Sequence, residues 1–285
     1  MPDTLGKFEL LERIGGGGYG NVYRARNTKT GTLAAVKELK PIFVADERNV
    51  ERFRREAALA ITLRHPNIVP VLDFDEAQGR YFIVMDYLDG HPLDKLLTRG
   101  APFALERALA ILRDIAAGLD YAHNIGVLHR DLKPQNIIIL KEDGRAVITD
   151  FGLARSFDQS GSTDTPTPTD TNRIGAGTPA YMSPEQVQNQ VLTRASDRYS
   201  LGVMAFQLLT GRLPFEGSEF DLHEGHVRKP PPDPRALNPA LAANTSAALL
   251  KMLSKQPEER FATAEEFIAA LQPVKSEETE VPKKR

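Results

Sequence analysis

Short apolar runs alternate with clusters of glycine, asparagine and threonine in the first part of the chain. These runs are rich in β-branched and aromatic residues and occupy 8–11, 21–25, 33–37, 68–72 and 81–85. Runs of this length between turn-forming residues are typical of strands joined as hairpins. The pattern predicts strands joined as hairpins, with the turn between the last two strands at 75–79.

One segment in this region has a helical period. The apolar positions of 47–64 recur every three or four residues, which predicts an amphipathic helix; they are Val50, Phe53, Ala57, Ala60 and Leu63. Glu56 lies beside this stripe, and a carboxylate near a buried face costs free energy unless it is paired. We predict that Glu56 pairs with Lys37; Glu51 is the less favoured alternative because it points further from the stripe.

The later part of the chain has helical patterns from about Leu93. One face of 105–123 carries Leu105, Leu109, Leu112, Ile115, Leu119 and Ala122, which predicts a long buried helix. A very apolar helix is predicted from Asp197, as its cap, to Gly211, just past its end.

Two shorter helices and one loop complete the prediction for this part. The helices are predicted over 246–253 and 264–271, and a Thr263-x-x-Glu266 capping box opens the second. The proline-rich stretch 229–239 is predicted to be an irregular surface loop.

Composition excludes several classes of site. The chain has 36 basic and 38 acidic residues, so it has no bulk attraction for nucleic acid or an anionic membrane. It has no cysteine, which excludes disulfides and thiolate metal sites and suits a reducing compartment. No run of 18 apolar residues occurs, and we predict a cytoplasmic location.

Two neighbouring segments carry the chemistry. The first reads H-R-D-L-K-P-Q-N at 129–136, and the second reads D-F-G at 150–152. Asp131 offers a carboxylate that can accept a hydroxyl proton, and Asn136 and Asp150 offer hard oxygen ligands of the kind that Mg²⁺ prefers. The β pair predicted over 137–140 and 146–149, with its turn at 142–144, would hold these two ligands at its ends.

A glycine-rich stretch precedes the second predicted strand. Residues 15–22 match G-x-G-x-x-G-x-V, and glycines let backbone amides approach phosphate oxygens closely. Alone, the stretch also fits a flexible turn. A dinucleotide-binding fingerprint needs a helix directly afterwards, and here the strand 21–25 follows, which favours a phosphate-covering flap.

Together these motifs resemble those of protein kinases. A further segment, G-T-P-A-Y-M-S-P-E at 177–185, resembles the one that docks substrate in that family, although Ser183 stands where the family usually has alanine. With D-L-K-P at 131–134, it resembles the serine/threonine branch. From about residue 8 to 271 the chain resembles a bacterial eukaryotic-like (Hanks-type) serine/threonine protein kinase.

The resemblance implies an α+β, bilobal fold. A small antiparallel β-sheet lobe with one main helix would occupy residues 1–88, and a larger, mainly helical lobe would occupy 89–271. The activation segment would be 150–185, and 272–285 would be a charged tail. The implied reaction is transfer of the γ-phosphoryl group of ATP, with Mg²⁺ or Mn²⁺, to serine and threonine hydroxyls of proteins.

The resemblance also assigns roles to single residues. Asp131 would position and deprotonate the hydroxyl, Lys133 and Lys37 would contact phosphate, Thr178 would orient Asp131, and Asn136 and Asp150 would hold metal. Glu56 would support Lys37, and Arg260 would pair with Glu185. The nucleotide would contact Ile14, Gly15, Gly17, Gly20, Val22, Ala35, Lys37, Met85, Asp86, Leu88 and Ile138, with Met85 as the gatekeeper.

The middle of the implied activation segment has a biased composition. Residues 156–172 are almost entirely serine, threonine, aspartate, proline and glycine, a composition that cannot bury a core. We predict a loop that is disordered at rest and ordered by autophosphorylation. The candidate phosphorylation sites are Thr163, Thr165, Thr167, Thr169 and Thr171, with Arg130 and Arg173 as partners for the phosphate.

Two other functions remain as alternatives. A pseudokinase scaffold typically lacks the lysine, the catalytic aspartate or the metal-binding aspartate, and this chain has all of them. A small-molecule kinase of related fold lacks the docking segment found here at 178–185. The expected partners are therefore proteins with serine or threonine and no nucleic acid.

The family also implies a homodimer through the smaller lobe. Residues 273–285 read either as a frayed tail or as a linker before a membrane helix. Membrane contact is expected only if the chain continues beyond residue 285, as the cytoplasmic domain of a receptor kinase.

Overall fold

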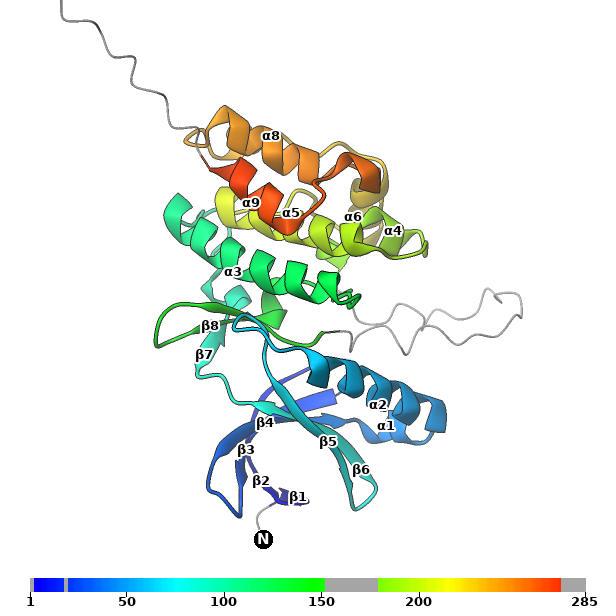
Figure 1. Cartoon of the computed structure of the whole chain (residues 1–285). Helices are drawn as coiled ribbons and strands as arrows, with labels where there is room; N and C mark the ends of the chain where they lie inside the picture. Colours follow the sequence, from blue (N-terminus) through cyan, green and yellow to red (C-terminus); the bar gives the residue numbers. More distant parts are fainter. Residues whose placement is uncertain (1–2, 18–19, 152–178, 273–285) are drawn as a thin grey trace, which may run out of the picture.

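The computed structural model describes residues 3–17, 20–151 and 179–272. Figure 1 shows two parts, a curved sheet that carries the amino terminus and a bundle of helices built from the later part of the chain. Thr178, Arg173 and the five candidate phosphorylation sites between Thr163 and Thr171 lie outside the described residues. The tail from 273 onward lies outside them as well.

The first part is a six-stranded antiparallel sheet in the order β1-β2-β3-β4-β6-β5. Its strands are β1 (Thr4–Leu5), β2 (Phe8–Gly16), β3 (Gly20–Asn27), β4 (Leu33–Leu39), β5 (Val71–Ala77) and β6 (Arg80–Asp86). The hairpin strands predicted from the apolar runs and the antiparallel sheet implied by the resemblance are both confirmed.

The predicted strand at 68–72 is shifted in the structure. Ile68 instead forms an isolated parallel bridge with Ile148, and β5 starts at Val71. The turn predicted at 75–79 is also shorter. Only Gln78 and Gly79 form it, with φ of 57° and 72°, and positive φ at both positions is typical of a type I′ hairpin turn.

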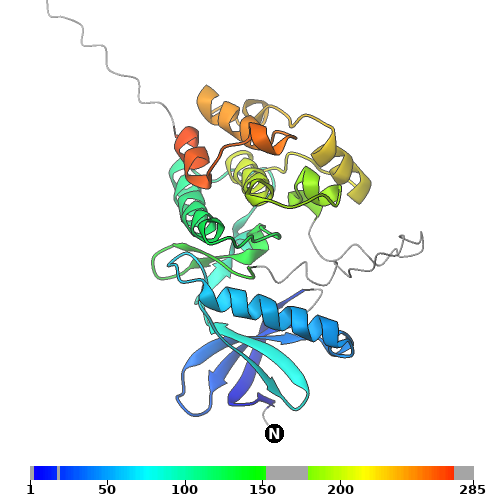
Figure 2. The same cartoon turned by 45° about the vertical axis from the view of Figure 1, so that its right-hand side comes forward.

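One long helix covers a face of the sheet. It is α2 (Glu47–Thr62), preceded by the short α1 (Pro41–Val44), and Figure 2 shows it lying across the strands. The amphipathic helix predicted over 47–64 is confirmed. Asp46 caps its start by accepting a hydrogen bond from Arg48 N, and its apolar stripe packs on Ala35, Leu39 and Ile83.

The second part is mainly helical. Its helices are α3 (Leu105–Asn124), α4 (Pro184–Val187), α5 (Arg194–Thr210), α6 (Glu219–Val227), α7 (Pro234–Leu237), α8 (Ala243–Met252) and α9 (Ala264–Leu271). The described residues of this part also contain the 3-10 turns η1 (Leu93–Leu96), η2 (Pro134–Asn136), η3 (Pro179–Tyr181) and η4 (Pro257–Glu259). None of the helices within 3–17, 20–151 and 179–272 has the length and hydropathy to span a membrane.

Several helix ends differ from the predictions. The start of α5 is capped by Thr193 in a capping box with Ser196, so Asp197 is not the cap. The short helix α7 forms within the predicted proline-rich loop, since Pro234 suits a first helical turn and Asp233 caps it. The helix predicted over 264–271 is confirmed. Only half of its capping box forms, because Glu266 accepts from Ala262 N instead of Thr263 N.

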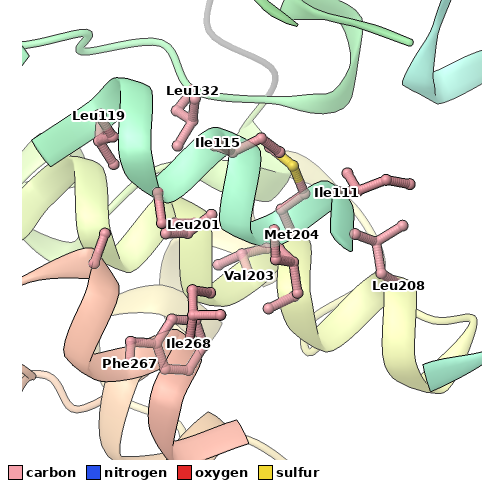
Figure 3. Close-up of a cluster of buried hydrophobic side chains, with 14 of the residues drawn as sticks. Ile111, Ile115, Leu119, Leu132, Leu201, Val203, Met204, Leu208, Phe267 and Ile268 are labelled. Carbon is pink, nitrogen blue, oxygen red and sulfur yellow. The ribbon is translucent and has the colours of Figure 1, made fainter. Parts of the chain in front are cut away.

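The core of the helical part lies where α3, α5 and α9 meet. Figure 3 shows Ile111, Ile115 and Leu119 of α3 facing Leu201 and Met204 of α5, with Phe267 and Ile268 of α9 beside them. Leu132, from the segment that carries Asp131, packs into the same core. The chemistry-bearing loop is therefore anchored in the rigid interior of the helical part.

A small second sheet joins the two parts. It consists of β7 (Gly90–Pro92), β8 (Ile137–Leu140) and β9 (Ala146–Ile148), and it confirms the hairpin predicted there. The segment after α2 is bonded to β9, because Val69 N donates to Ile148 O at 2.9 Å and Ile148 N donates to Asn67 O at 2.8 Å. Gly118 of α3 approaches this junction closely; a Cβ there would lie 3.1 Å from Asn67 O.

Candidate active site

A cavity of about 310 Å³ lies between the sheet and the helical part. It is lined by all of the residues predicted to contact nucleotide: Ile14, Gly15, Gly17, Gly20, Val22, Ala35, Lys37, Met85, Asp86, Leu88 and Ile138. Asp131, Lys133, Asn136 and Asp150 line it from the other side. Residues from distant stretches of the chain thus converge on one space.

The sequence prediction missed four lining residues, namely Gly16, Val69, Gln135 and Thr149. Gln135 lies inside the H-R-D-L-K-P-Q-N motif and could have been included on that ground. Val69 gave no local signal, since it reaches the cavity only through the hydrogen bonds that join its segment to β9.

The described part of the glycine-rich stretch forms the end of β2 and the start of β3. Gly17 N donates to Gly20 O at 2.9 Å, and Lys40 Nζ donates to Gly17 O at 2.7 Å. A Cβ on Gly20 would lie 2.6 Å from Glu38 O, so a side chain at that position would force the strands apart. Because β3 follows directly, the helix that a dinucleotide fingerprint needs is absent at this place in the described chain.

Lys37 contacts Asp150 across the cavity. Lys37 Nζ donates to Asp150 Oδ1 at 2.8 Å, and their side chains are 13% and 27% exposed. Burial would raise the pKa of the Asp150 carboxyl, but the Lys37 ammonium, with smaller contributions from His129 and Lys133, holds this pKa below its usual range.

The ion pair predicted between Lys37 and Glu56 is not present among the residues that the structure describes. Lys37 and Asp150 both line the cavity, whereas Glu56 lies on the buried face of α2. The alternative partner, Glu51, bonds to Arg55 one turn along α2 at 2.8 Å. Lys37 therefore faces a proposed metal ligand in this structure, and Glu56 takes no part in that contact.

A second lysine–carboxylate pair, Lys133 and Asp131, lines the same cavity. Lys133 Nζ and Asp131 Oδ2 are 2.7 Å apart, and Asn136 Nδ2 donates to Asp131 O at 2.8 Å. Thr149 N donates to Asn136 O at 2.8 Å, which closes the base of the β8–β9 hairpin. Two carboxylates, one amide oxygen and two ammonium groups are thereby held together, an arrangement suited to binding a polyanion with a metal ion.

A model of the protein kinase domain matches residues 8–270. The chain belongs to the protein kinase family. Serine/threonine-protein kinase pkn3 of Myxococcus xanthus is 39% identical over 278 residues, which are 95% of this chain and 50% of the relative. Serine/threonine-protein kinase PrkC of Bacillus subtilis is 37% identical over 265 residues, 93% of this chain and 40% of the relative.

The fold agrees with this membership. The crystal structure of the Mycobacterium tuberculosis PknI kinase domain superposes with a TM-score of 0.72 at 29% identity, covering 95% of this chain and 97% of that one. The bilobal fold class inferred from the motifs is confirmed. The chain spans half or less of the length of the two curated relatives it matches.

The carboxylate of Asp197 binds the backbone of the segment 129–136. It accepts from His129 N at 2.8 Å and Arg130 N at 2.7 Å, and it lies 2.8 Å from His123 Nε2. Burial would raise the pKa of Asp197, but the bonds from these partners lower it. The sequence prediction missed this role; a lone carboxylate on an otherwise apolar helix was the available signal.

A second buried ion pair lies behind the docking segment. Arg260 Nη1 and Nη2 donate to Glu185 Oε1 and Oε2 at 2.7 and 3.0 Å, which confirms the pair that the resemblance implied. The guanidinium also donates to three backbone oxygens, those of Ala195, Ser254 and Lys255. All five of its N–H groups are therefore satisfied.

Proposed function

We propose that this chain is a serine/threonine protein kinase that transfers the γ-phosphoryl group of ATP to hydroxyl groups of proteins. The observation that carries the proposal is the convergence of Lys37, Asp131, Lys133, Asn136 and Asp150 on one cavity of about 310 Å³. The names of the relatives, which are serine/threonine-protein kinases, support the choice of substrate.

The residues present fit a divalent cation. Asn136 uses its amide nitrogen on Asp131, which leaves the amide oxygen as its ligand atom, and Asp150 contributes a carboxylate. These are hard oxygen donors of the kind that Mg²⁺ and Mn²⁺ bind. When bound, the ion would neutralise charge on the phosphate groups.

The chain's own residues perform the remaining steps. Asp131 orients the attacking hydroxyl and accepts its proton, and Lys133 stabilises charge on the transferred group. In this structure each lysine neutralises a carboxylate, since Lys37 pairs with Asp150 and Lys133 with Asp131. Phosphate oxygens would offer both ammonium groups new acceptors, which would free Asp131 for the attacking hydroxyl and Asp150 for the metal ion.

The proposal is tested by incubating the purified chain with Mg·ATP and a general protein substrate. Each transferred phosphoryl group adds about 80 Da, so intact-mass and peptide spectrometry count and locate the sites. We expect labelling of serine or threonine by the wild type and none by Asp131→Asn. Absence of labelling by a wild type that binds ATP would support the scaffold or small-molecule kinase alternatives.

Self-activation and assembly are parts of the same proposal. We expect the wild type to label its own Thr163, Thr165, Thr167, Thr169 or Thr171, which peptide mapping would locate. The homodimer through the smaller lobe stays a prediction that light scattering would test. The cytoplasmic location and the domain boundaries at 88 and 271 are further predictions.

A further inference from the structure

The side chain of Gln186 connects helix α4 to the catalytic loop. Its Nε2 donates to Arg130 O at 2.6 Å, and its Oε1 accepts from Ser183 N at 2.9 Å. Ser183 N is a backbone donor, so it fixes which end of the amide is oxygen and which is nitrogen. The side chain is 7% exposed, so water does not readily replace either bond.

The bonded carbonyl belongs to the peptide group that leads into Asp131. Arg130 has φ of 69°, a left-handed conformation that a residue with a Cβ adopts only when its surroundings impose it. Asp197 Oδ1 accepts from Arg130 N at 2.7 Å, and His129 Nδ1 accepts from Asp131 N at 3.3 Å. Gln186 fixes the remaining polar atom of this peptide, its oxygen.

We infer that Gln186 is a positioning residue for Asp131, and that it acts by holding the Arg130–Asp131 peptide plane. The inference rests on the proposed kinase function for its effect on rate. It also links α4, which starts within the segment 177–185 implied to dock substrate, with the group proposed to take the hydroxyl proton. Loss of the Nε2 bond frees a strained peptide to rotate and moves the Asp131 carboxylate with it.

A purely structural role for Gln186 makes a different prediction. Gln186 occupies the N3 position of a capping box whose N-cap is Ser183. Glutamate serves the N3 position as well as glutamine does. Glutamate keeps the oxygen that accepts from Ser183 N but, when ionised, has no donor for Arg130 O. Gln186→Glu therefore separates the capping role from the positioning role.

The experiment compares Gln186→Glu with Gln188→Glu, an exposed position on the same short segment that receives the same change of charge. For Gln186→Glu we expect kcat to fall about tenfold, which corresponds to about 1.4 kcal/mol of barrier. KM for ATP and the thermal midpoint should stay close to the wild type. Gln188→Glu should keep the wild-type kcat.

The pH dependence provides a second signature. At low pH the introduced carboxylic acid is protonated and can again donate to Arg130 O, so the kcat ratio of Gln186→Glu to wild type should rise from pH 8 to pH 6. Gln186→Leu cannot regain the bond, and its ratio should stay low and flat. A Gln186→Glu kcat equal to that of Gln188→Glu, or a flat ratio, would overturn the inference.

One readout does not depend on activity. The backbone amide resonance of Asp131 should shift in Gln186→Glu and stay in place in Gln188→Glu. An inactive wild type with this shift would refute the kinase proposal and leave the positioning role standing. An unshifted Asp131 amide in both variants would refute the positioning role, whatever the activity of the wild type.

Discussion

The ion pair between Lys37 and Asp150 in the cavity differs in kind from the pair between Glu185 and Arg260 inside the helical part. Lys37 and Asp150 meet in the cavity, share one hydrogen bond and are 13% and 27% exposed. Glu185 and Arg260 lie within the helical part, are 5% and 0% exposed, and share two hydrogen bonds. The first pair has room to take new partners, whereas the second has every donor of its guanidinium in use.

On the proposed kinase function, the difference separates a pair that takes part in the reaction from a pair that only stabilises the fold. A lysine that exchanges a carboxylate for a phosphate should make few hydrogen bonds beforehand, since each of these bonds would have to break during the reaction. A residue that fixes the docking segment has the opposite requirement, because an unsatisfied buried charge costs several kcal/mol. Breaking the Lys37–Asp150 pair should therefore lower activity, and breaking the Glu185–Arg260 pair should lower stability.

The largest effect is expected for Lys37→Met. Removal of one preorganised charge that stabilises a transition state lowers rates by roughly 100-fold or more, and we expect such a loss of phosphoryl transfer. The thermal midpoint should change little, because Asp150 remains partly exposed. The exposed Lys29→Met serves as the control for loss of positive charge. Near-wild-type transfer by Lys37→Met would remove Lys37 from the mechanism.

Glu185→Gln should act in the opposite way. It leaves Arg260 as a buried charge without its carboxylate, which typically costs about 3–5 kcal/mol of unfolding free energy. Arg260→Lys should also destabilise, because an ammonium cannot reproduce five N–H donors in a planar fork. Urea unfolding measures both variants. A loss below about 1 kcal/mol for Glu185→Gln, the range of exposed pairs, would contradict the comparison.

His226 should make the helical part sensitive to acid. Burial, with a smaller contribution from Lys255, lowers the pKa of His226 from 6.5 to about 4. Because the folded pKa is below the unfolded one, the neutral ring stabilises the fold fully above pH 6.5, and this contribution is lost as the pH falls toward 4. A shift of this size corresponds to at most about 3 kcal/mol.

Urea unfolding at pH 7 and pH 5 would measure this loss. The carboxyls of Asp150, Asp197 and Glu185 have lowered pKa values and stay ionised in this window, so they do not mask the histidine. His226→Asn should lose less stability between the two pH values than the wild type does. An equal loss in both proteins would assign the acid sensitivity to other groups.

The smallest effect is expected for Thr263→Ala, at the start of α9 and outside the cavity. Thr263 Oγ1 accepts from Glu266 N at 3.0 Å at the start of α9, and loss of such a cap costs about 1 kcal/mol. Asp120 still accepts from Ala264 N and Glu265 N in Thr263→Ala, which limits the damage. We expect a small fall in thermal midpoint with unchanged phosphoryl transfer. Reduced transfer at a temperature where the variant is fully folded would contradict this separation.

Residues whose role depends on local spacing were predictable from the sequence. Asn136 and Asp150 flank a hairpin that can be recognised from its own residues, so their meeting followed from the pattern. The partner of Lys37 was not predictable in this way. The sequence offered Glu56 and Glu51, and only three-dimensional distance shows that Asp150 is the carboxylate in contact. Asp197 was misread as a helix cap because a capping carboxylate and a buried acceptor look alike in sequence.

Other features had no local signal. Helix α6 has no one-sided apolar stripe, and only Gly225 and His226 are buried in it, so periodicity did not reveal it. Gln186 is one glutamine among several near 186–190, and its bond to Arg130 joins residues 56 positions apart. Long-range hydrogen bonds of this kind appear only once the fold is known.

The junction beside Gly118 has a mechanical consequence. The sheet part is joined to the helical part by the chain between β6 and β7, by the backbone bonds of 67–69 to Ile148 and by the Lys37–Asp150 pair. Helix α3 can approach the bonds of 67–69 only because residue 118 has no Cβ. A larger side chain in place of Gly118 would act as a wedge that pushes α3 away from Asn67 and Ile68, so this one glycine sets how closely the two parts fit together.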